Sequence, residues 1–131
     1  FYSPSHDFIQ MPNKQDFKGT NKSTSKESYY GTLLHELAHW TGHEKRLKRD
    51  FGKRFGSNSY AFEELVAETS STFLSCLLGL NPTPREDNAI YLNNWLSVLK
   101  KDKKAMVKAF GLAQKVSDYL LEYDVEVKKV A

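Results

Sequence analysis

The sequence contains a single cysteine, Cys76, among its 131 residues. One thiol can form neither an intrachain disulfide nor a cysteine-based zinc site, and this scarcity favours a reducing, cytoplasmic location. No apolar run approaches the roughly 18 residues that a membrane-spanning helix needs, and no secretory signal is visible, so a membrane partner is not expected. The chain begins with Phe1 rather than Met, which predicts a domain excised from a longer protein.

A strong excess of charge of either sign is also missing. The formal net charge is +3, with 27% charged and 40% hydrophobic residues, which is the composition of an ordinary soluble globular protein. The mild basicity is spread along the chain and is typical of a solvated surface, so it does little to favour a nucleic-acid partner. A chain of this length is expected to form a single domain over residues 1–131 with one hydrophobic core.

Apolar periodicity and turn residues predict an α+β domain that is mostly helical, with a small N-terminal sheet and about four helices. Residues 1–12 are predicted to be extended, with an edge strand at 8–11, and residues 13–26 and 42–58 are predicted to be loops. The helices are expected at about 27–41, 59–78, 84–100 and 103–122. A charged, frayed tail is expected over 124–131, where Val125 and Val127 alternate as in a short strand.

The expected helix ends rest on capping residues and glycines. They are Ser25 or Ser28 and Gly42 for the first helix, Ser59 and Gly79 for the second, and Asp102 at the start of the fourth. The side chains expected to face the core recur at helical spacing. They are Leu33, Leu34, Leu37 and Trp40, then Ala89, Leu92, Leu96 and Leu99, and then Met106, Phe110, Ala113, Val116 and Leu120. Phe51 and Phe55 are expected to anchor the loop before the second helix.

The segment from Tyr29 to His43 contains the pattern H-E-x-x-H at residues 35–39. In a helix, His35 and His39 lie one turn apart on one face, so that both imidazoles can reach one zinc ion. Glu36 can then lie beside a water molecule that the ion activates and serve as a catalytic base. A catalytic zinc site needs three protein ligands and an open position for water, so one more donor has to come from elsewhere in the chain.

The metzincin pattern H-E-x-x-H-x-x-G-x-x-H does not continue in this chain. Gly42 fits it, but Lys45 stands where the third histidine belongs. Met11 and Met106 are the only methionines, so a Met-turn is not available either. His43 is another contender for the third ligand. Gly42 ends the predicted helix before it, however, so a surface or substrate-facing role is favoured for His43.

The second predicted helix carries Glu64 and Glu68 one turn apart on one face. Two carboxylates placed together are costly unless a cation compensates their charge. A glutamate ligand followed four residues later by an acid is the arrangement of thermolysin-like gluzincins, in which the later acid accepts the outer N–H of a ligand histidine. We therefore assign Glu64 as the third ligand and Glu68 as the hydrogen-bond partner of a histidine, with the reverse assignment as the alternative.

Simpler interpretations stand beside these. Paired histidines on a helix are often ordinary polar residues, and an acidic cluster alone is usually a solvated helix face, so only their combination favours a metal site. Tyr60 is a candidate to polarise a substrate carbonyl, although packing is the commoner role for such an aromatic residue. The basic run after the first helix could contact phosphates, but a solvated surface is favoured. It comprises Lys45, Arg46, Lys48, Arg49, Lys53 and Arg54.

The chain resembles the C-terminal zincin-like metallopeptidase domain of ArdC-type antirestriction proteins, which plasmids, conjugative elements and phages carry. The resemblance rests above all on H-E-L-A-H-W-T-G-H at 35–43 and E-E-L-V-A-E at 63–68. Further matching segments are residues 2–4, 7–12, 29–34, 46–47, 55–57, 60–61, 91–92 and 95–96. The resemblance implies a minimal gluzincin-like fold, a divalent metal ion on His35, His39 and a glutamate, and Glu36 as the base. It also implies an upstream domain that binds single-stranded DNA, so a nucleic-acid partner would belong to that missing domain.

Together these observations predict a zinc-dependent peptidase that acts on a peptide or protein substrate, with manganese or another divalent ion as the alternative metal. An extended substrate is expected to pair with the edge strand near Phe8–Met11. The rival from another class is a catalytically inactive, metal-containing binding module that supports a DNA-binding parent protein. A metal-dependent nuclease is a third and less favoured hypothesis, because two histidines, a glutamate ligand and a neighbouring glutamate suit carbonyl hydrolysis better.

Overall fold

The computed structural model describes residues 1–51, 58–81, 95–96, 100, 102 and 104–130, with the backbone alone over 124–130. Its elements are β1 (Tyr2–Ser3), β2 (Phe8–Ile9), a 3-10 helix (Lys14–Asp16), α1 (Ser25–Thr41), α2 (Asn58–Leu77) and α4 (Ala105–Val130). The predicted class, mostly helical with a small N-terminal sheet, is confirmed. The predicted helix over 84–100 lies largely outside the described residues, and within it Leu96 is exposed rather than buried.

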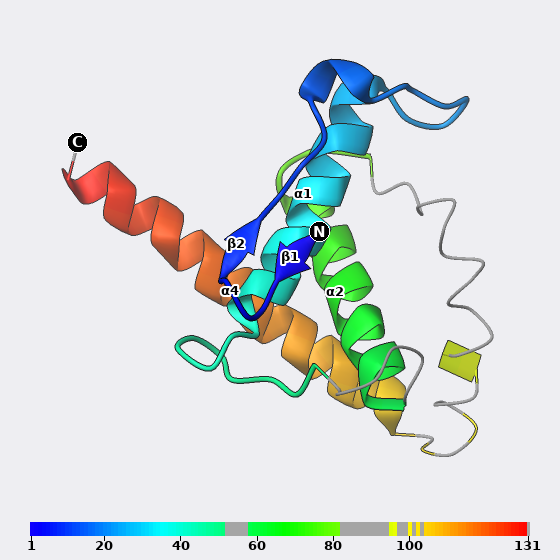
Figure 1. Cartoon of the computed structure of the whole chain (residues 1–131), viewed down its shortest axis with the longest axis vertical. Coiled ribbons are helices and arrows are strands. Elements are labelled where there is room, and N and C mark those ends of the chain that lie inside the picture. Colours follow the sequence, from blue (N-terminus) through cyan, green and yellow to red (C-terminus); the bar gives the residue numbers. More distant parts are fainter. Residues whose placement is uncertain (52–57, 82–94, 97–99, 101, 103, 131) are drawn as a thin grey trace.

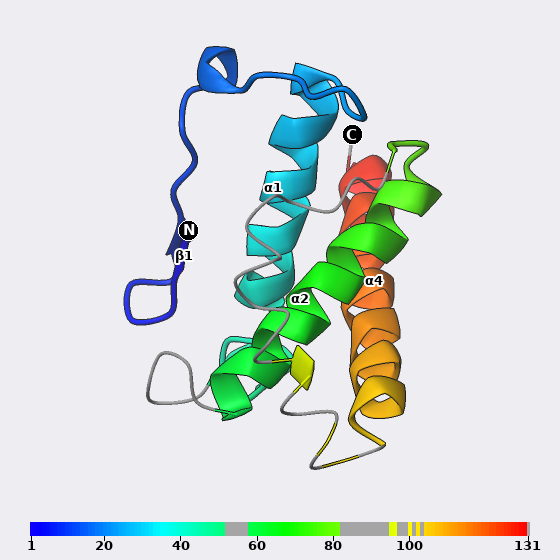
Figure 2. The same cartoon turned by 90° about the vertical axis from the view of Figure 1, so that its right-hand side faces the viewer.

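The helix α2 packs against both α1 and α4, and α4 crosses behind the other two helices (Figure 1). The hairpin of β1 and β2 lies against α1, on the side of α1 that is remote from α4 (Figure 2). None of the described helices combines the length and the apolar character that crossing a membrane would require. The hairpin, α1 and α2 meet in one region, and the predicted site residues lie there.

The N-terminus of α1 is fixed by a capping box that begins at Thr24. The Thr24 side chain accepts a hydrogen bond from the Glu27 N–H, and the Glu27 carboxylate accepts one from the Thr24 N–H. The predicted caps Ser25 and Ser28 are wrong, because only Thr24 has a glutamate three residues later to reciprocate. The helix ends at Thr41 with Gly42 as its cap, as predicted.

The helix α2 begins at Asn58, one residue before the predicted start, so Ser59 lies inside the helix and is not its cap. The helix ends at Leu77, and Gly79 then adopts a φ of +69°. Glycine reaches this left-handed conformation without the steric penalty of a Cβ atom. The prediction that Gly79 ends the helix is therefore confirmed.

The core lies between α2 and the two helices beside it, and small side chains line it: Ala38, Leu65, Val66, Ala67, Ala109 and Val116. On α1 the buried face is the one that carries His35 and His39. These polar side chains can lie inside because α2 supplies hydrogen-bond partners for them, which periodicity in one helix cannot show. The predicted core stripe of α1 is right for Leu34, which is buried, but its other members are only half-buried: Leu33, Leu37 and Trp40.

The helix α4 is rotated relative to the predicted core stripe. Ala109, Ala113 and Val116 are fully buried, whereas Met106 and Phe110 are exposed. Apolar residues recur on two neighbouring faces of this helix, and the face with small side chains is the one that fits closely against α2. The prediction for Met106 and Phe110 is therefore wrong.

The two ends of α4 compare differently with their predictions. Asp102, which precedes the helix, accepts a hydrogen bond from the Lys104 N–H, as expected of a cap. Residues 124–130 continue the helix, so the predicted frayed tail and short strand are wrong. The physical reason is that no Gly or Pro follows Gly111 in this segment, while Glu and Lys are good helix formers.

Candidate metal centre

The two histidines of H-E-x-x-H lie one turn apart on the buried face of α1. Their Nε2 atoms are 3.2 Å apart, and the two rings are inclined at 82° to each other. His35 is 5% exposed and His39 is 9% exposed. The helix therefore directs both Nε2 atoms to one point, as the spacing predicts.

Glu64, from α2, completes this cluster. Its Oε1 lies 3.4 Å from His39 Nε2, and its Oε2 lies 3.5 Å from His35 Nε2. Metal bonds of roughly 2.0–2.2 Å in a tetrahedral arrangement place neighbouring ligand atoms about 3.3 Å apart. The separation of the two Nε2 atoms, 3.2 Å, is close to this value, and one Glu64 oxygen lies near each of them. Two imidazole nitrogens and a carboxylate oxygen suit Zn²⁺ and tolerate other divalent ions. The three side chains could therefore hold one metal ion.

The charges in this cluster favour a cation. Burial acts to raise the pKa of Glu64, but its hydrogen bonds with His35 and His39 outweigh burial and hold that pKa well below its usual range. Burial acts to lower the pKa of His39, but the hydrogen bonds and charges of Glu63 and Glu64 outweigh it and raise the pKa to about 9. The point between the Nε2 atoms therefore attracts either a proton or a metal ion.

Each histidine is held from behind by a carboxylate. His35 Nδ1 donates to Glu68 Oε2 at 3.1 Å, and His39 Nδ1 donates to Glu63 Oε1 at 3.1 Å. A carboxylate acceptor at Nδ1 fixes the ring orientation and directs the Nε2 lone pair towards a metal ion. The structure thus places Glu64 beside both Nε2 atoms and Glu68 behind His35, and the assignment of Glu64 as the metal ligand stays a prediction.

Glu63 is a site residue that the sequence pattern did not single out. It precedes Glu64 by one residue, and one residue turns a helix by about 100°. Its carboxylate therefore passes to the outer side of His39, while Glu64 reaches the inner side. One signal in the sequence could have found it. The segment 63–68 holds three glutamates, and a metal ligand and one hydrogen-bond partner account for only two of them.

Two arginines of the basic run are buried in ion pairs. Arg46 binds Asp7 and Arg49 binds Glu63, and the arginine side chains are 9% and 5% exposed. The interpretation of the run as a solvated surface is therefore wrong for these two residues, because carboxylates distant in the sequence neutralise them. It holds for Lys45 and Lys48, which are exposed, whereas Lys53 and Arg54 lie outside the described residues.

Glu36 is held by the main chain of β1. Its Oε2 accepts a hydrogen bond from the Tyr2 N–H at 2.7 Å, and the residue is 8% exposed. Phe1 and Gln10 face each other next to the pair of Tyr2 and Ile9, and the Gln10 N–H donates to the Phe1 carbonyl at 2.9 Å. Because hydrogen-bonded and non-hydrogen-bonded pairs alternate in an antiparallel hairpin, the Tyr2 N–H and carbonyl point away from β2. The strand edge next to Glu36 therefore belongs to β1 and not to the predicted segment Phe8–Met11 (Figure 1).

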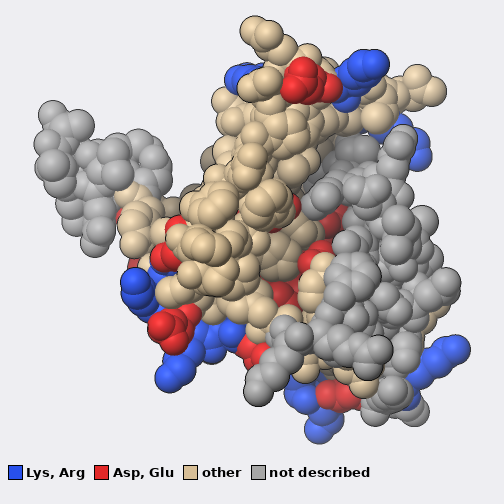
Figure 3. Space-filling model, viewed as in Figure 1, with Lys and Arg blue, Asp and Glu red and all other residues tan. Residues whose placement is uncertain are grey.

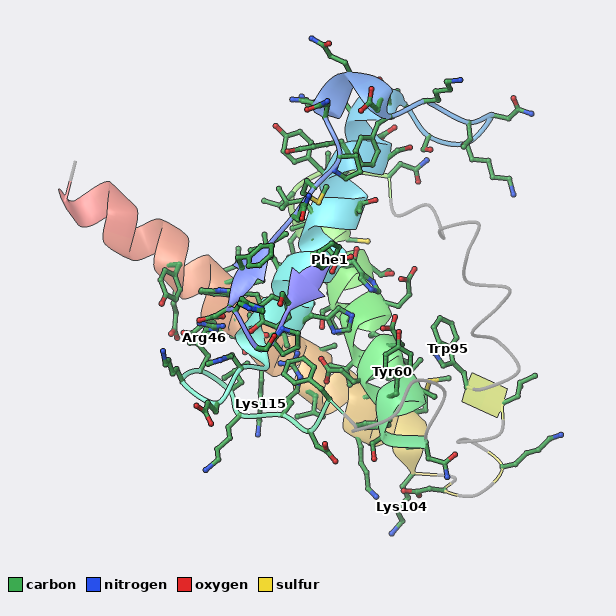
Figure 4. The ribbon with its side chains drawn as sticks, viewed as in Figure 1. Phe1, Arg46, Tyr60, Trp95, Lys104 and Lys115 are labelled. Atoms are coloured by element: carbon green, nitrogen blue, oxygen red, sulfur yellow. The ribbon has the colours of Figure 1, made fainter. Side chains whose placement is uncertain are left out.

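Arg46 anchors this hairpin to the end of α1 (Figure 4). Its guanidinium donates to both carboxylate oxygens of Asp7, to Tyr2 Oη at 3.3 Å and to the Trp40 carbonyl oxygen at 2.6 Å. It also lies over the Trp40 ring, 3.8 Å from the centroid. The hydrogen bond from Arg46 lowers the pKa of Asp7 to about 2. Burial, together with Asp7, raises the pKa of Tyr2 to about 12.

Tyr60 and His43 are the remaining sequence candidates. Tyr60 is half-buried in the first turn of α2, one turn before Glu64 (Figure 4), and its catalytic role stays a prediction. His43 lies just beyond the cap of α1, where its Nδ1 accepts the Lys45 N–H at 3.2 Å. The group of converging ligand atoms found in the described residues does not include His43.

The surface beside the cluster has an acidic character. Figure 3 shows Asp and Glu side chains gathered around a hollow near the middle of this face, with Lys and Arg side chains mainly towards its edges. A concentration of negative charge in a hollow raises the local concentration of cations.

These features define a class of site. A helix with H-E-x-x-H, a glutamate on the next long helix that faces both histidines, and a carboxylate behind each histidine together form a candidate metal centre of the zincin type. The chain belongs to the family of zincin-like metallopeptidases, whose family model matches residues 1–111.

Known relatives agree with this assignment. DNA primase TraC from Escherichia coli is 41% identical over 124 residues, which cover 95% of this chain and 11% of TraC. The protein y4eC of Sinorhizobium fredii is 38% identical over 120 residues, which cover 92% of this chain and 37% of y4eC. The chain therefore spans about a tenth of TraC and about a third of y4eC.

Two solved structures share the fold. The crystal structure of the antirestriction protein ArdC from plasmid R388, in its Mn(II)-bound form, has a TM-score of 0.80 and 43% identity, covering 93% of this chain and 43% of that chain. The metal-free form of ArdC has a TM-score of 0.77. The predicted resemblance to the ArdC-type domain and its zincin-like fold is therefore confirmed.

Proposed function

We propose that this domain is a metal-dependent peptidase in which His35, His39 and Glu64 hold one divalent ion. The observation that carries the proposal is that one ligand atom each from His35, His39 and Glu64 lie within 4.8 Å of one another. Glu36 neighbours His35 on the same helix. Zn²⁺ is the ion that this donor set favours. Mn²⁺ is the alternative, because the similar ArdC protein has a Mn(II)-bound structure.

The chemistry would be hydrolysis of a peptide bond. An ion bound here would act as a Lewis acid towards the scissile carbonyl and would make a water molecule acidic enough to lose a proton near neutral pH. Glu36 would take this proton and pass it to the leaving amine, which requires an ionised carboxylate within hydrogen-bond reach of the water. Because the Tyr2 N–H holds Oε2, Oε1 is the oxygen that would take the proton. Tyr60 would approach the substrate carbonyl from α2.

The substrate would be an extended segment of a peptide or protein. The outer edge of β1 lies beside Glu36, and an extended chain that pairs with a strand edge gains main-chain hydrogen bonds. Pairing with β1, and not with β2, would bring a peptide to the metal cluster. Contacts with nucleic acid would belong to other parts of longer proteins, since TraC and ArdC both extend far beyond the matched region.

A catalytically inactive metal-containing module within a DNA-binding parent protein is the second candidate. The observation that favours it is that the similar proteins are named as a DNA primase and an antirestriction protein. The similarity to the metal-free form of ArdC, with a TM-score close to that of the Mn(II)-bound form, argues only against a structural role for the ion. A fold that persists without its ion does not need that ion as a structural support.

The test is the variant Glu36→Gln, which keeps the shape of the side chain and removes the base. We expect it to bind the same amount of metal as the wild type and to lose hydrolysis of an unbiased peptide library. The matched control is Glu122→Gln on the exposed side of α4, which should keep both properties. Full activity in Glu36→Gln contradicts the mechanism. A wild-type protein that binds metal and cleaves nothing in the library supports the inactive module.

A further inference from the structure

Two buried charges near the metal cluster have no part in the proposed chemistry. Glu63 is 3% exposed, and the Arg49 side chain is 5% exposed. Removing both charges from water costs free energy, and an apolar pair of similar volume is often equally stable. Their contacts therefore call for a reason other than stability alone.

Glu63 connects Arg49 to a metal ligand. Its Oε1 accepts the His39 Nδ1–H at 3.1 Å and an Arg49 Nη2–H at 2.8 Å, while its Oε2 accepts the Arg49 Nε–H at 3.0 Å. A two-point contact between guanidinium and carboxylate fixes the plane of the carboxylate. The direction in which Glu63 binds the imidazole is fixed with it.

Arg49 is in turn held by the end of α1. Its Nη2 donates to the Ala38 carbonyl at 2.6 Å, and its Nη1 donates to Thr41 Oγ1 at 2.9 Å. Its backbone N–H donates to the Gly42 carbonyl at 2.8 Å. A Cβ atom at Gly42 would lie 2.9 Å from Arg49 Nη2, so the guanidinium occupies space that a side chain at this position would take. The positive charge is thus fixed to the same helix that carries His39.

We infer that Arg49 and Glu63 are positioning residues for His39 and that the metal affinity of the site depends on them. The inference rests on the proposed metal site. Glu63 keeps His39 Nδ1 as a donor, so that Nε2 faces the ion, and Arg49 keeps Glu63 at the distance and angle that this requires.

The first measurement is the affinity for Zn²⁺ and for Mn²⁺, obtained by competition with a chelator. Affinities are compared on the high-pH plateau, where proton competition does not enter. Arg49→Met and Glu63→Gln should each weaken binding by about 10–100-fold, as removal of other partners of ligand histidines does. Arg49→Lys should also weaken it, because an ammonium group keeps the charge but cannot make the two-point contact. The double variant Arg49→Met/Glu63→Gln should be little weaker than either single variant, since both act through one contact.

The matched control is Arg46→Met, a second buried arginine from the same loop that binds Asp7. It should lower the thermal unfolding temperature and leave the metal affinity within about twofold of wild type. The rate at which the His39 Nδ1 proton exchanges with water, measured by NMR, is the second readout, and Arg46→Met shows how much of any change follows from lost stability alone. In the metal-loaded wild type this proton should exchange slowly with water, and in Arg49→Met it should exchange faster.

Four outcomes separate the possibilities. The inference is overturned if Arg49→Lys and Glu63→Gln both bind metal with wild-type affinity. This test does not need Arg49→Met to fold. The inference is also overturned if Arg46→Met loses as much metal affinity as the other variants. A wild type that binds metal without cleaving peptides contradicts only the proposed activity. A wild type that binds no divalent ion contradicts both.

Discussion

Raising the pH from 7 to 9 is expected to strengthen metal binding by about 50-fold. In the metal-free protein, His39 is expected to carry a proton, because Glu63 and Glu64 outweigh the effect of burial and raise its pKa to about 9. An ion can bind His39 Nε2 only after this proton has left, so protons and metal ions compete for one site.

The size of the effect follows from the pKa. Competition with one proton raises the apparent dissociation constant by a factor of 1 + 10^(pKa − pH). With a pKa of about 9 this factor is about 100 at pH 7, whereas a histidine with its ordinary pKa of 6.5 would give about 1.3. Glu64 adds nothing in this range, because its pKa lies well below the usual value and it stays ionised. The affinity should therefore rise about tenfold per pH unit up to about pH 9 and then level off.

Two assays check this. Chelator competition between pH 6 and pH 9.5 gives the slope, and calorimetry in buffers of different ionisation enthalpy counts the protons released, which should be about one per ion at pH 7. Glu63→Gln should move the levelling point to lower pH, because it removes one of the two charges that raise the pKa of His39. An affinity that stays constant between pH 7 and 9 would contradict the competition between a proton and the metal ion for His39.

The stability of the metal-free protein should change in the opposite direction over the same range. A pKa raised from 6.5 to about 9 stabilises the folded state by up to about 3 kcal/mol. This stabilisation is complete below pH 6.5 and is lost as the pH rises through about 9. Urea unfolding of the protein in the presence of a chelator measures it. A free energy of unfolding that does not fall between pH 6.5 and 9 would contradict the protonated His39.

Three further predictions concern the fold around the site. Leu74→Ala removes a side chain that is 2% exposed and should lower the free energy of unfolding in urea by about 2–5 kcal/mol. Gly42→Ala brings a Cβ atom to 2.9 Å from Arg49 Nη2. It should cost about 1–3 kcal/mol in the same assay and should also weaken metal binding. Asp7→Asn removes a carboxylate whose pKa is lowered from 3.8 to about 2 by its hydrogen bond with Arg46. Its stabilising effect is complete above pH 3.8 and is lost as the pH falls through about 2, so the acid unfolding of the variant should depend less on pH in this range.

Each of these has a contrary result. A Leu74→Ala protein as stable as wild type would place that side chain outside the core. Unchanged metal affinity in a folded Gly42→Ala protein would show that Arg49 can move without disturbing the site. Identical acid unfolding curves for Asp7→Asn and wild type, followed by tryptophan fluorescence, would exclude a stabilising ion pair between Asp7 and Arg46.

Much of the metal centre could be predicted because helix geometry is a local property. The spacing of four residues between His35 and His39 puts both rings on one face of any α-helix. The same spacing relates Glu64 to Glu68 on the next helix. The chemistry of histidine ligands predicts Glu64 as the ligand and Glu68 as a hydrogen-bond partner, and the structure places Glu64 near both Nε2 atoms and Glu68 beside His35 Nδ1.

Other features could not be predicted because they depend on contacts between distant segments. Amphipathic periodicity showed that α4 had apolar residues, but two faces were available, and only the fit against α2 selected the one with Ala109 and Val116. The cap of α1, by contrast, is a local feature, because Thr24 and Glu27 are three residues apart and form a capping box.

Local spacing is enough to predict the mostly helical class of the fold, the helix that carries H-E-x-x-H, and the residue types able to bind a metal ion. How the donors from α1 and α2 meet and are held depends on tertiary packing. Arg49 reaches Glu63 across 14 residues, and the Tyr2 N–H reaches Glu36 across 34. Such contacts depend on where a loop folds back and where a strand packs, and no local pattern records that.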